Sequence, residues 1–559
     1  MSDAIDEQAT AVPHTTPLPD APHAEDDTVT PEAVRREVRD FLRSHEERNR
    51  QFPRAALVGM LAGLAAVAFR WSLAAGDTLR NGLIAWAHRH PIWGWVLPML
   101  VGAVGAGVAV RMVRRLAPET AGSGIPHVKA VLYRLHSLRW GRILPVKFLG
   151  GTLGIGGGLA LGREGPTIQM GGAMGAGVAQ LLKVTSRERQ TLIAAGAGAG
   201  LAAAFNAPLA GLVFVLEEVQ RDFSPTVFAV SLVAAVTADV VTRLLTGQLP
   251  VFHIATFPAP PLSALPAFLA LGLLAGVLGV AFNRALLGSL NLFARLRHWP
   301  AGLPAVLVGA SVGLVGWFAP SALGGGQPLV EQVLTGNTLL HLILVWFLLR
   351  FALTMFSYGC GAPGGIFAPL LVLGALLGLA VGKVTQSIAP GLILHPQAVA
   401  VVGMGAYFAA IVRAPLTGIV LIVEMTNNYP LMLPLLVACL SAYAVADLMG
   451  DRPIYEALLE RDLLRSQATP ELGETLLLEL PLQPGSPFDG KQVRDLGLPP
   501  GCVLITVRRG VQESVPTADT RLQAGDWITA VIAAHAARAA TMLREGCTAG
   551  HGQSTVAGG

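Results

Sequence analysis

The chain alternates long apolar segments with short polar loops from about Ala55 to Leu448, and this pattern constrains the fold more than any other feature. Charged residues make up only 14% of the chain, whereas soluble domains carry about 25%. A helix that crosses a bilayer needs about 20 apolar residues. The pattern predicts an all-α polytopic membrane protein, with apolar segments near 54–74, 93–112, 145–160, 190–217, 227–247, 264–284, 302–320, 338–356, 365–385, 398–425 and 431–448.

Several of these segments are shorter than a membrane span or are interrupted by Gly and Pro. Irregular backbone is tolerated at membrane depth only where protein or a water-filled cavity satisfies its polar groups. Interrupted segments therefore indicate a transport site in the membrane domain, which a simple anchor would not need.

Three motifs recur in order along the membrane domain. Their spacings are 202, 203 and 207 residues, which is too regular for chance repetition even in a Gly-rich chain. The membrane domain is therefore expected to consist of two related halves. The pairs are Gly122-Ser-Gly-Ile-Pro126 with Gly324-Gly-Gly-Gln-Pro328, Gly162-Arg-Glu-Gly-Pro166 with Gly365-Ile-Phe-Ala-Pro369, and Asn206-Ala-Pro-Leu-Ala-Gly211 with Arg413-Ala-Pro-Leu-Thr-Gly418; the third pair places Glu217 opposite Glu424.

Composition divides the rest of the chain. The N-terminal residues are acidic and lack the basic and apolar regions of a secretory signal, so both termini are expected in the cytoplasm. After Tyr455 a charged linker leads to short β-like runs separated by Gly, Pro and Asp turns, which indicate a small α+β soluble domain. The expected segments are a disordered tail (1–34), a cytoplasmic amphipathic helix (35–51), the transport domain (52–460), a linker (461–475), the α+β domain (476–535) and a C-terminal tail (536–559).

The sequence gives no reason to expect an enzyme or a bound cofactor. Its four cysteines are scattered without metal-like spacing. No nucleophile–base pair, metal cluster or nucleotide loop is evident in the sequence, and no nucleic-acid partner is expected.

An anion site inside a bilayer needs positive potential without an unpaired fixed charge, which is costly to bury. Helix N-termini provide it through free backbone N–H groups, and Gly and Pro favour such helix starts. Three segments fit this description: Gly122–Pro126, Gly162–Pro166 and Gly364–Pro369.

These motifs, with the run from Phe205 to Gly211 that leads to Glu217-Glu218, resemble the CLC family of chloride channels and chloride/proton exchangers over about residues 52–460. The resemblance implies two inverted repeats of tilted and re-entrant helices, and a homodimer in membrane lipid with one anion pathway per subunit. It implies a chloride/proton antiporter of a bacterial inner membrane. A passive chloride channel of the same fold is the first alternative. A ligand sensor with a structural membrane bundle is the second, and deletion of residues 470–559 would test it.

The resemblance also implies an anion site formed by Ser123, Gly122, Arg163, Gly165, Ile366, Phe367 and Tyr455. Ser123 and Tyr455 are expected to contribute hydroxyl groups, and Ile366 and Phe367 backbone N–H groups. Ser123 could instead be a helix N-cap, Phe367 a core residue, and Tyr455 an interfacial anchor.

Glu164 is expected to gate the pathway from the external side and to carry the proton. Its carboxylate competes with chloride for the same positive site, and protonation releases it. A simple helix-capping role is the alternative. Arg163 is expected to support the local field, or to form a structural ion pair.

Glu218 is the expected internal proton glutamate and favours exchange over passive conduction; the alternative is an acid at a water-exposed helix end. Glu217 is expected to assist proton arrival or to stabilise the structure. His127 and Lys129 depart from bacterial exchangers, which often carry acidic residues after this motif. This departure predicts positive charge near the inner mouth of the pathway, which would favour the entry of anions. It leaves the residues of the proton route beyond Glu218 undetermined.

The α+β domain resembles the TrkA-C type in its Val-Arg-Arg-Gly510 and Ala-Gly-Asp526 turns. This resemblance implies a regulatory or dimer-stabilising role and a possible small ligand.

Overall fold

The computed structural model describes residues 31–90, 92–248, 252, 254, 256–300, 302–335, 338–465, 476–510, 512–533 and 538–548. Most of the expected N-terminal tail, the second part of the expected linker and the last eleven residues lie outside them. The first helix, α1 (Pro31–Ala87), begins within the expected tail and includes the expected amphipathic helix. Residues up to Arg50 form a unit of their own, so the membrane domain is described from Gln51 onward.

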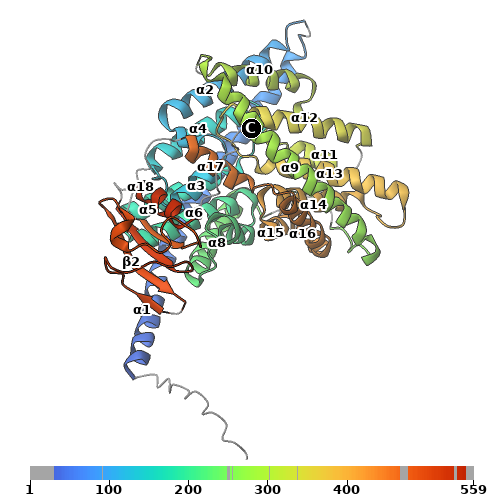
Figure 1. Ribbon diagram of the computed structural model, residues 1–559. Coiled ribbons are helices and arrows are strands. Elements are labelled where there is room, and N and C mark those ends of the chain that lie inside the picture. The colour runs from blue at the N-terminus through green and yellow to red at the C-terminus, as the bar shows by residue number, and fades with distance from the viewer. Residues whose placement is uncertain are drawn as a thin grey trace, which may run out of the picture. The chain divides into compact units, whose positions relative to one another are not determined.

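The membrane domain consists of two repeats in which the helices that follow the recurring motifs come in the same order, as the motifs predict. The first repeat follows α1 and contains α2 (Val96–Leu116), η1 (Pro118–Thr120), α3 (Ile125–Leu132), α4 (Trp140–Gly156), α5 (Glu164–Leu181), α6 (Ser186–Phe205), α7 (Pro208–Phe214) with the π-helical turn η2 (Val215–Val219), and α8 (Pro225–Thr246). Figure 1 shows these helices tilted at many different angles to one another.

The second repeat begins with the long helix α9 (Leu265–Arg295), flanked by η3 (Leu262–Ala264) and η4 (Leu296–His298). It continues with α10 (Leu303–Phe318), η5 (Pro320–Ala322), α11 (Gln327–Leu334), α12 (Leu340–Gly359), α13 (Phe367–Ile388), α14 (Pro396–Val412), α15 (Pro415–Thr426), η6 (Tyr429–Leu431) and α16 (Met432–Leu448). Helix α17 (Ile454–Arg465) follows the second repeat. Among the described residues, seven helices are long and apolar enough to cross a membrane.

Two of the expected apolar segments are each two helices. Segment 190–217 divides into α6 and α7, and segment 398–425 divides into α14 and α15. At each division a non-glycine residue adopts the left-handed conformation, Asn206 with φ 53° and Arg413 with φ 66°. A proline two residues later starts the next helix, where its missing N–H costs nothing.

The C-terminal domain is a four-stranded antiparallel sheet with the strand order β1-β4-β2-β3. Its elements are β1 (Leu476–Pro481), η7 (Val493–Leu496), β2 (Cys502–Arg509), β3 (Gln512–Ser514), β4 (Trp527–Ile532) and α18 (Arg538–Cys547). The prediction of a tail over 536–559 is wrong for residues 538–547, which form α18. Ala539, Leu543 and Cys547 recur every four residues and join the buried core of the domain, as one face of a helix does.

Candidate functional site

The two repeats meet through their Gly-rich motifs. The backbone N–H of Gly162 donates to the Gly365 carbonyl at 2.7 Å, and the N–H of Gly365 donates to the Gly162 carbonyl at 2.8 Å. The Gly122 N–H donates to the Ala362 carbonyl at 3.1 Å, and the Gly364 N–H to the Gly122 carbonyl at 3.0 Å. These four hydrogen bonds bring together the starts of three helices, α3, α5 and α13, which the sequence predicts as anion-binding segments.

Glu164 is the first residue of α5, and its carboxylate is directed at the other repeat. Oε2 accepts a hydrogen bond from the Ala368 N–H at 3.3 Å, in the first turn of α13. The side chain is 4% exposed. A helix N-terminus favours an anion through its free N–H groups and its dipole, so the carboxylate occupies a position suited to an anion.

Ser123 lies beside the start of α5. Its Oγ accepts from the Ile125 N–H at 3.3 Å, at the start of α3, although the N-cap residue of this helix is Gly124. A Cβ added at Gly165 would lie 2.8 Å from the Ser123 carbonyl oxygen and 2.9 Å from its Cα. Gly165 therefore lets the N-terminus of α5 approach Ser123 closely.

Tyr358, near the end of α12, is a neighbour of Ser123 that the sequence analysis missed. Its hydroxyl accepts from the Ser123 N–H at 3.5 Å, and a Cβ at Gly122 would lie 2.8 Å from that hydroxyl. An isolated Tyr in a long apolar segment gives no sequence signal for a site.

Tyr455, at the start of α17, is completely buried. Its hydroxyl has no hydrogen-bond partner among the described residues. Buried hydroxyls almost always have a partner, so the Tyr455 hydroxyl is suited to donate to a bound anion.

Ile366 and Phe367 lie at the N-terminus of α13, where backbone N–H groups precede the first intrahelical hydrogen bond. Both residues are fully buried. The Phe367 ring packs among three other rings, with centroid distances of 5.3 Å to Phe205, 6.4 Å to Phe214 and 4.5 Å to Phe408. Phe367 thus combines a core side chain with a backbone position at the site.

Two cavities approach this region. One, of about 770 Å³, is lined by Glu164, Arg163 and Ala368 and is called the Glu164 cavity below. The other, of about 1150 Å³, is lined by Gly122, Tyr358 and His127 and is called the Tyr358 cavity below. Arg163 lines the Glu164 cavity, and its Nη2 donates to the Ala204 carbonyl at 3.3 Å.

Two buried cations hold the loops before α3 and α11, and the sequence analysis missed both. Lys147 Nζ donates to the carbonyls of Thr120 at 3.0 Å and Gly122 at 2.7 Å. Arg350 donates to the carbonyls of Ala322 at 2.6 Å and Gly324 at 2.5 Å. Lys147 and Arg350 are 203 residues apart, the same spacing as between Gly162 and Gly365. This spacing is the sequence signal that would have identified them as a repeat-related pair.

Glu217 and Glu424 form a second repeat-related pair. The Glu217 carboxylate accepts from the N–H groups of Leu416 at 3.0 Å and Thr417 at 2.7 Å, in the first turn of α15, and from Thr417 Oγ1 at 2.7 Å. The Glu424 carboxylate accepts from the N–H groups of Leu209 at 3.1 Å and Ala210 at 2.7 Å, in the first turn of α7. Each glutamate therefore caps a helix of the other repeat.

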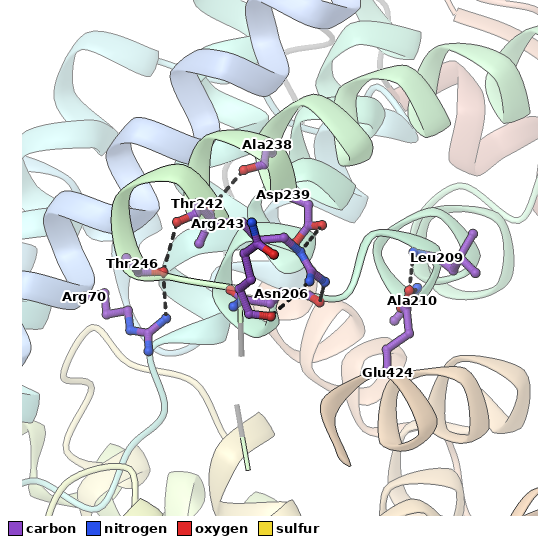
Figure 2. Close-up of polar contacts among 11 residues, drawn as sticks. Arg70, Asn206, Leu209, Ala210, Ala238, Asp239, Thr242, Arg243, Thr246 and Glu424 are labelled. Atoms are coloured by element: carbon purple, nitrogen blue, oxygen red, sulfur yellow. Dashed lines mark hydrogen bonds and ion pairs between the residues drawn. The ribbon is translucent and has the colours of Figure 1, made fainter. Parts of the chain in front are cut away.

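Figure 2 shows the Glu424 side chain directed at Leu209 and Ala210. It also shows Arg243 of α8 next to α7, where its guanidinium bonds to Asp239 Oδ2 at 2.7 Å and to the Asn206 carbonyl at 2.9 Å. Arg243 thus holds the left-handed residue that separates α6 from α7.

Glu218 lies in η2 and is completely buried. Its Oε1 is 2.6 Å from Lys129 Nζ, and neither side chain is exposed. The expectation that Lys129 adds positive charge to an inner mouth is therefore corrected, because its ammonium is neutralised inside the protein. His127 does line the Tyr358 cavity.

Comparisons with known proteins agree with this architecture. Residues 105–447 match the family described as voltage gated chloride channel, and residues 477–543 match the TrkA-C domain. The chain is 41% identical over 430 residues to an H(+)/Cl(−) exchange transporter ClcA of Vibrio parahaemolyticus. The aligned region covers 75% of this chain and 91% of that protein. It is 41% identical over 422 residues to the Klebsiella pneumoniae ClcA, covering 74% of this chain and 89% of that protein.

Among solved structures, the fold is similar to that of a slow cyanobacterial Cl−/H+ antiporter. The TM-score is 0.72 at 37% identity, and the match covers 75% of this chain and 99% of that one. The predicted fold class and both resemblances are thereby confirmed. The chain is an integral membrane protein that belongs to the voltage gated chloride channel family and carries a C-terminal TrkA-C domain.

Proposed function

We propose that the chain is a secondary-active chloride/proton antiporter. The observation that carries this proposal is the Glu164 carboxylate at the N-terminus of α13, where it accepts from the Ala368 N–H. A carboxylate and a chloride ion compete for such a site. When chloride displaces the carboxylate, the displaced Glu164 takes a proton from the Glu164 cavity, so the two ions move in opposite directions.

The anion site of this proposal includes Gly122, Ser123, Gly165, Ile366, Phe367 and Tyr455. Chloride reaches it through the Tyr358 cavity on the cytoplasmic side and leaves through the Glu164 cavity on the external side. Arg163 contributes positive potential from the wall of the Glu164 cavity. Glu218 is the internal proton glutamate of this proposal. The relatives named as exchange transporters support antiport as the activity.

Flux through liposomes tests the proposal. A chloride gradient imposed on the purified protein should drive protons uphill. In Glu218→Val, chloride flux should continue without proton movement. Wild-type protein that moves chloride with no uphill proton flux would refute the antiporter and leave a passive channel.

A passive chloride channel is the second candidate, and Lys129 is the observation that favours it. Glu218 has to give up its ion pair with Lys129 before it can accept a proton. The same flux measurement decides between the two functions.

We further propose a homodimer in a bacterial inner membrane, with both termini in the cytoplasm and a regulatory C-terminal domain that binds a small ligand. Light scattering of the detergent-solubilised protein should give the mass of two chains. The mass of a single chain would contradict the dimer.

A further inference from the structure

The buried Glu218 carboxylate has one oxygen in an ion pair and one without a hydrogen-bond partner. Lys129 binds Oε1, whereas Oε2 has no hydrogen bond within the described part of the chain. Because Glu218 is completely buried, a proton cannot reach it directly from bulk water. An intermediate group with access to solvent is required.

Arg221 connects Glu218 to such a group. Its Nη2 lies 3.8 Å from Glu218 Oε2 and also forms a close ion pair with Glu456 Oε1. The side chains of Arg221 and Glu456 are 43% and 35% exposed. Glu456 is thus a carboxylate with access to solvent, and it is separated from the buried one by a single guanidinium.

Among the described residues, Tyr455 at the start of α17 interacts electrostatically with Glu218. Tyr133, at the end of α3, interacts electrostatically with Glu218, Arg221 and Glu456. Arg452, just before α17, interacts with Glu456 and is itself paired with Glu460.

Glu217 does not provide an alternative route. All three of its hydrogen bonds are to the first turn of α15. Breaking them would uncap a helix of the other repeat. Within the described part of the chain, Glu456 forms one ion pair, with Arg221.

We propose that Glu456 is the carboxylate that exchanges protons between cytoplasmic water and Glu218, with Arg221 moving between the two. This inference rests on the proposed antiport. A hydronium ion protonates Glu456 and breaks its ion pair, and the guanidinium then moves toward Glu218 Oε2. The O–H bond of Glu456 next breaks and one forms on Glu218 through intervening water, after which Arg221 pairs with Glu456 again.

The exchange carries one added positive charge, that of the proton, through the cluster. When Glu218 takes up the proton, Lys129 gives up its ion pair with Oε1. Arg221 remains protonated throughout, as a guanidinium does in proteins, and no electrons are transferred. The cation follows the negative charge from one carboxylate to the other. Separating a proton from its counter-charge inside the protein would be costly, and the movement of Arg221 avoids that separation.

Glu456→Gln in the full-length chain tests the proposal in liposomes. The rate of chloride-driven proton flux should fall about tenfold or more, as expected when a proton-transfer group is lost, and Glu456→Asp should restore most of it. Glu460→Gln is the matched control, because Glu460 is an exposed carboxylate on the same helix, one turn away. It should behave as wild type.

A further variant separates proton transfer from charge. In Glu456→Cys, a methanethiosulfonate reagent can attach a sulfonate that keeps the negative charge but binds no proton at neutral pH. The four native cysteines are buried and provide little background. Proton flux should remain low after labelling; recovery would show that only charge matters and would overturn the proposal.

The outcomes for the two proposals are distinguishable. Absence of proton coupling in the wild type refutes the antiporter itself. Coupling that is lost in Glu218→Gln but unchanged in Glu456→Gln overturns only the role of Glu456.

Discussion

Replacement of Glu217 by Gln tests whether this residue stabilises the two repeats or transfers protons. An amide has one acceptor oxygen in place of two, so at least one hydrogen bond to Leu416 or Thr417 is lost. A hydrogen bond to a charged group contributes about 1.5–3 kcal/mol. Loss of a negative charge at a partly buried helix N-terminus costs about 0.3–2 kcal/mol more. The expected decrease in the free energy of unfolding is therefore about 2–5 kcal/mol.

Glu424→Gln should have a similar effect, because it removes the corresponding cap on α7. Leu209 and Glu217 are separated by about 12 Å along α7 and η2, at a rise of 1.5 Å per residue, so the two caps are far enough apart for their effects to add within about 0.5 kcal/mol. Unfolding in mixed micelles by titration with SDS measures the single and double variants. Glu331→Gln, at an exposed position on α11, is the control.

The same variants are assayed for flux in liposomes. Glu217→Gln should keep the wild-type ratio of chloride to protons while its stability falls. Unchanged stability together with a changed ratio would refute the capping role and assign Glu217 to the proton route. A double variant no less stable than either single variant would refute the independence of the two caps.

Three other predictions concern Gly165, the pair Lys147 and Arg350, and Asp526. Gly165→Ala should weaken chloride binding about tenfold in calorimetry, because the added Cβ would displace Ser123 at a cost of about 1–3 kcal/mol. An unaltered chloride affinity would contradict the close approach of Gly165 to Ser123. Lys147→Met should reduce both the free energy of unfolding and the chloride affinity, because Lys147 bonds to the Gly122 carbonyl. Arg350→Met should reduce the free energy of unfolding alone, because Arg350 bonds to Gly324 in the other repeat. Equal chloride affinities in the two variants would argue against this difference. Burial alone would raise the pKa of Asp526, but hydrogen bonds from the Arg509 guanidinium and the Gln523 N–H lower the pKa. The stability from this contact is complete above the ordinary carboxyl pKa of about 3.9 and is lost as pH falls through the lowered pKa. Protection factors for hydrogen exchange in β4, which correct for the pH dependence of the intrinsic exchange rate, should therefore fall in acid, and they should be low in Asp526→Asn at neutral pH as well.

The sequence predicts the parts of the fold that depend on local pattern. The apolar segments, the repeat and the motif glycines all follow from residue type and spacing, and the hydrogen bonds between Gly162 and Gly365 join two of the motifs. The Arg-Arg and Gly-Asp turns of the C-terminal domain likewise meet in the ion pair between Arg509 and Asp526.

The features that the sequence analysis missed depend on tertiary contacts. Arg413 ends α14 in a left-handed conformation that Arg does not favour by itself; its Nη2 bonds to the Asp451 carbonyl at 3.2 Å. Lys147 and Arg350 are single cations in apolar helices, and only the folded chain brings carbonyl oxygens to them. Tyr358 acquires its position beside Ser123 from the packing of α12, which no local pattern encodes.

In the proposed antiporter, the positions of Glu164 and Phe367 account for the coupled movement of two ions by a scaffold of two related halves. Both residues stand at the same place in their repeats, 203 residues apart, at the first position of α5 and α13. The Phe367 ring lies among Phe205, Phe214 and Phe408, where a carboxylate would lack polar partners. The Glu164 carboxylate instead bonds to the Ala368 N–H of the opposite repeat. Both helix N-termini can therefore favour an anion, but only α5 carries a side chain that can compete with it and take up a proton.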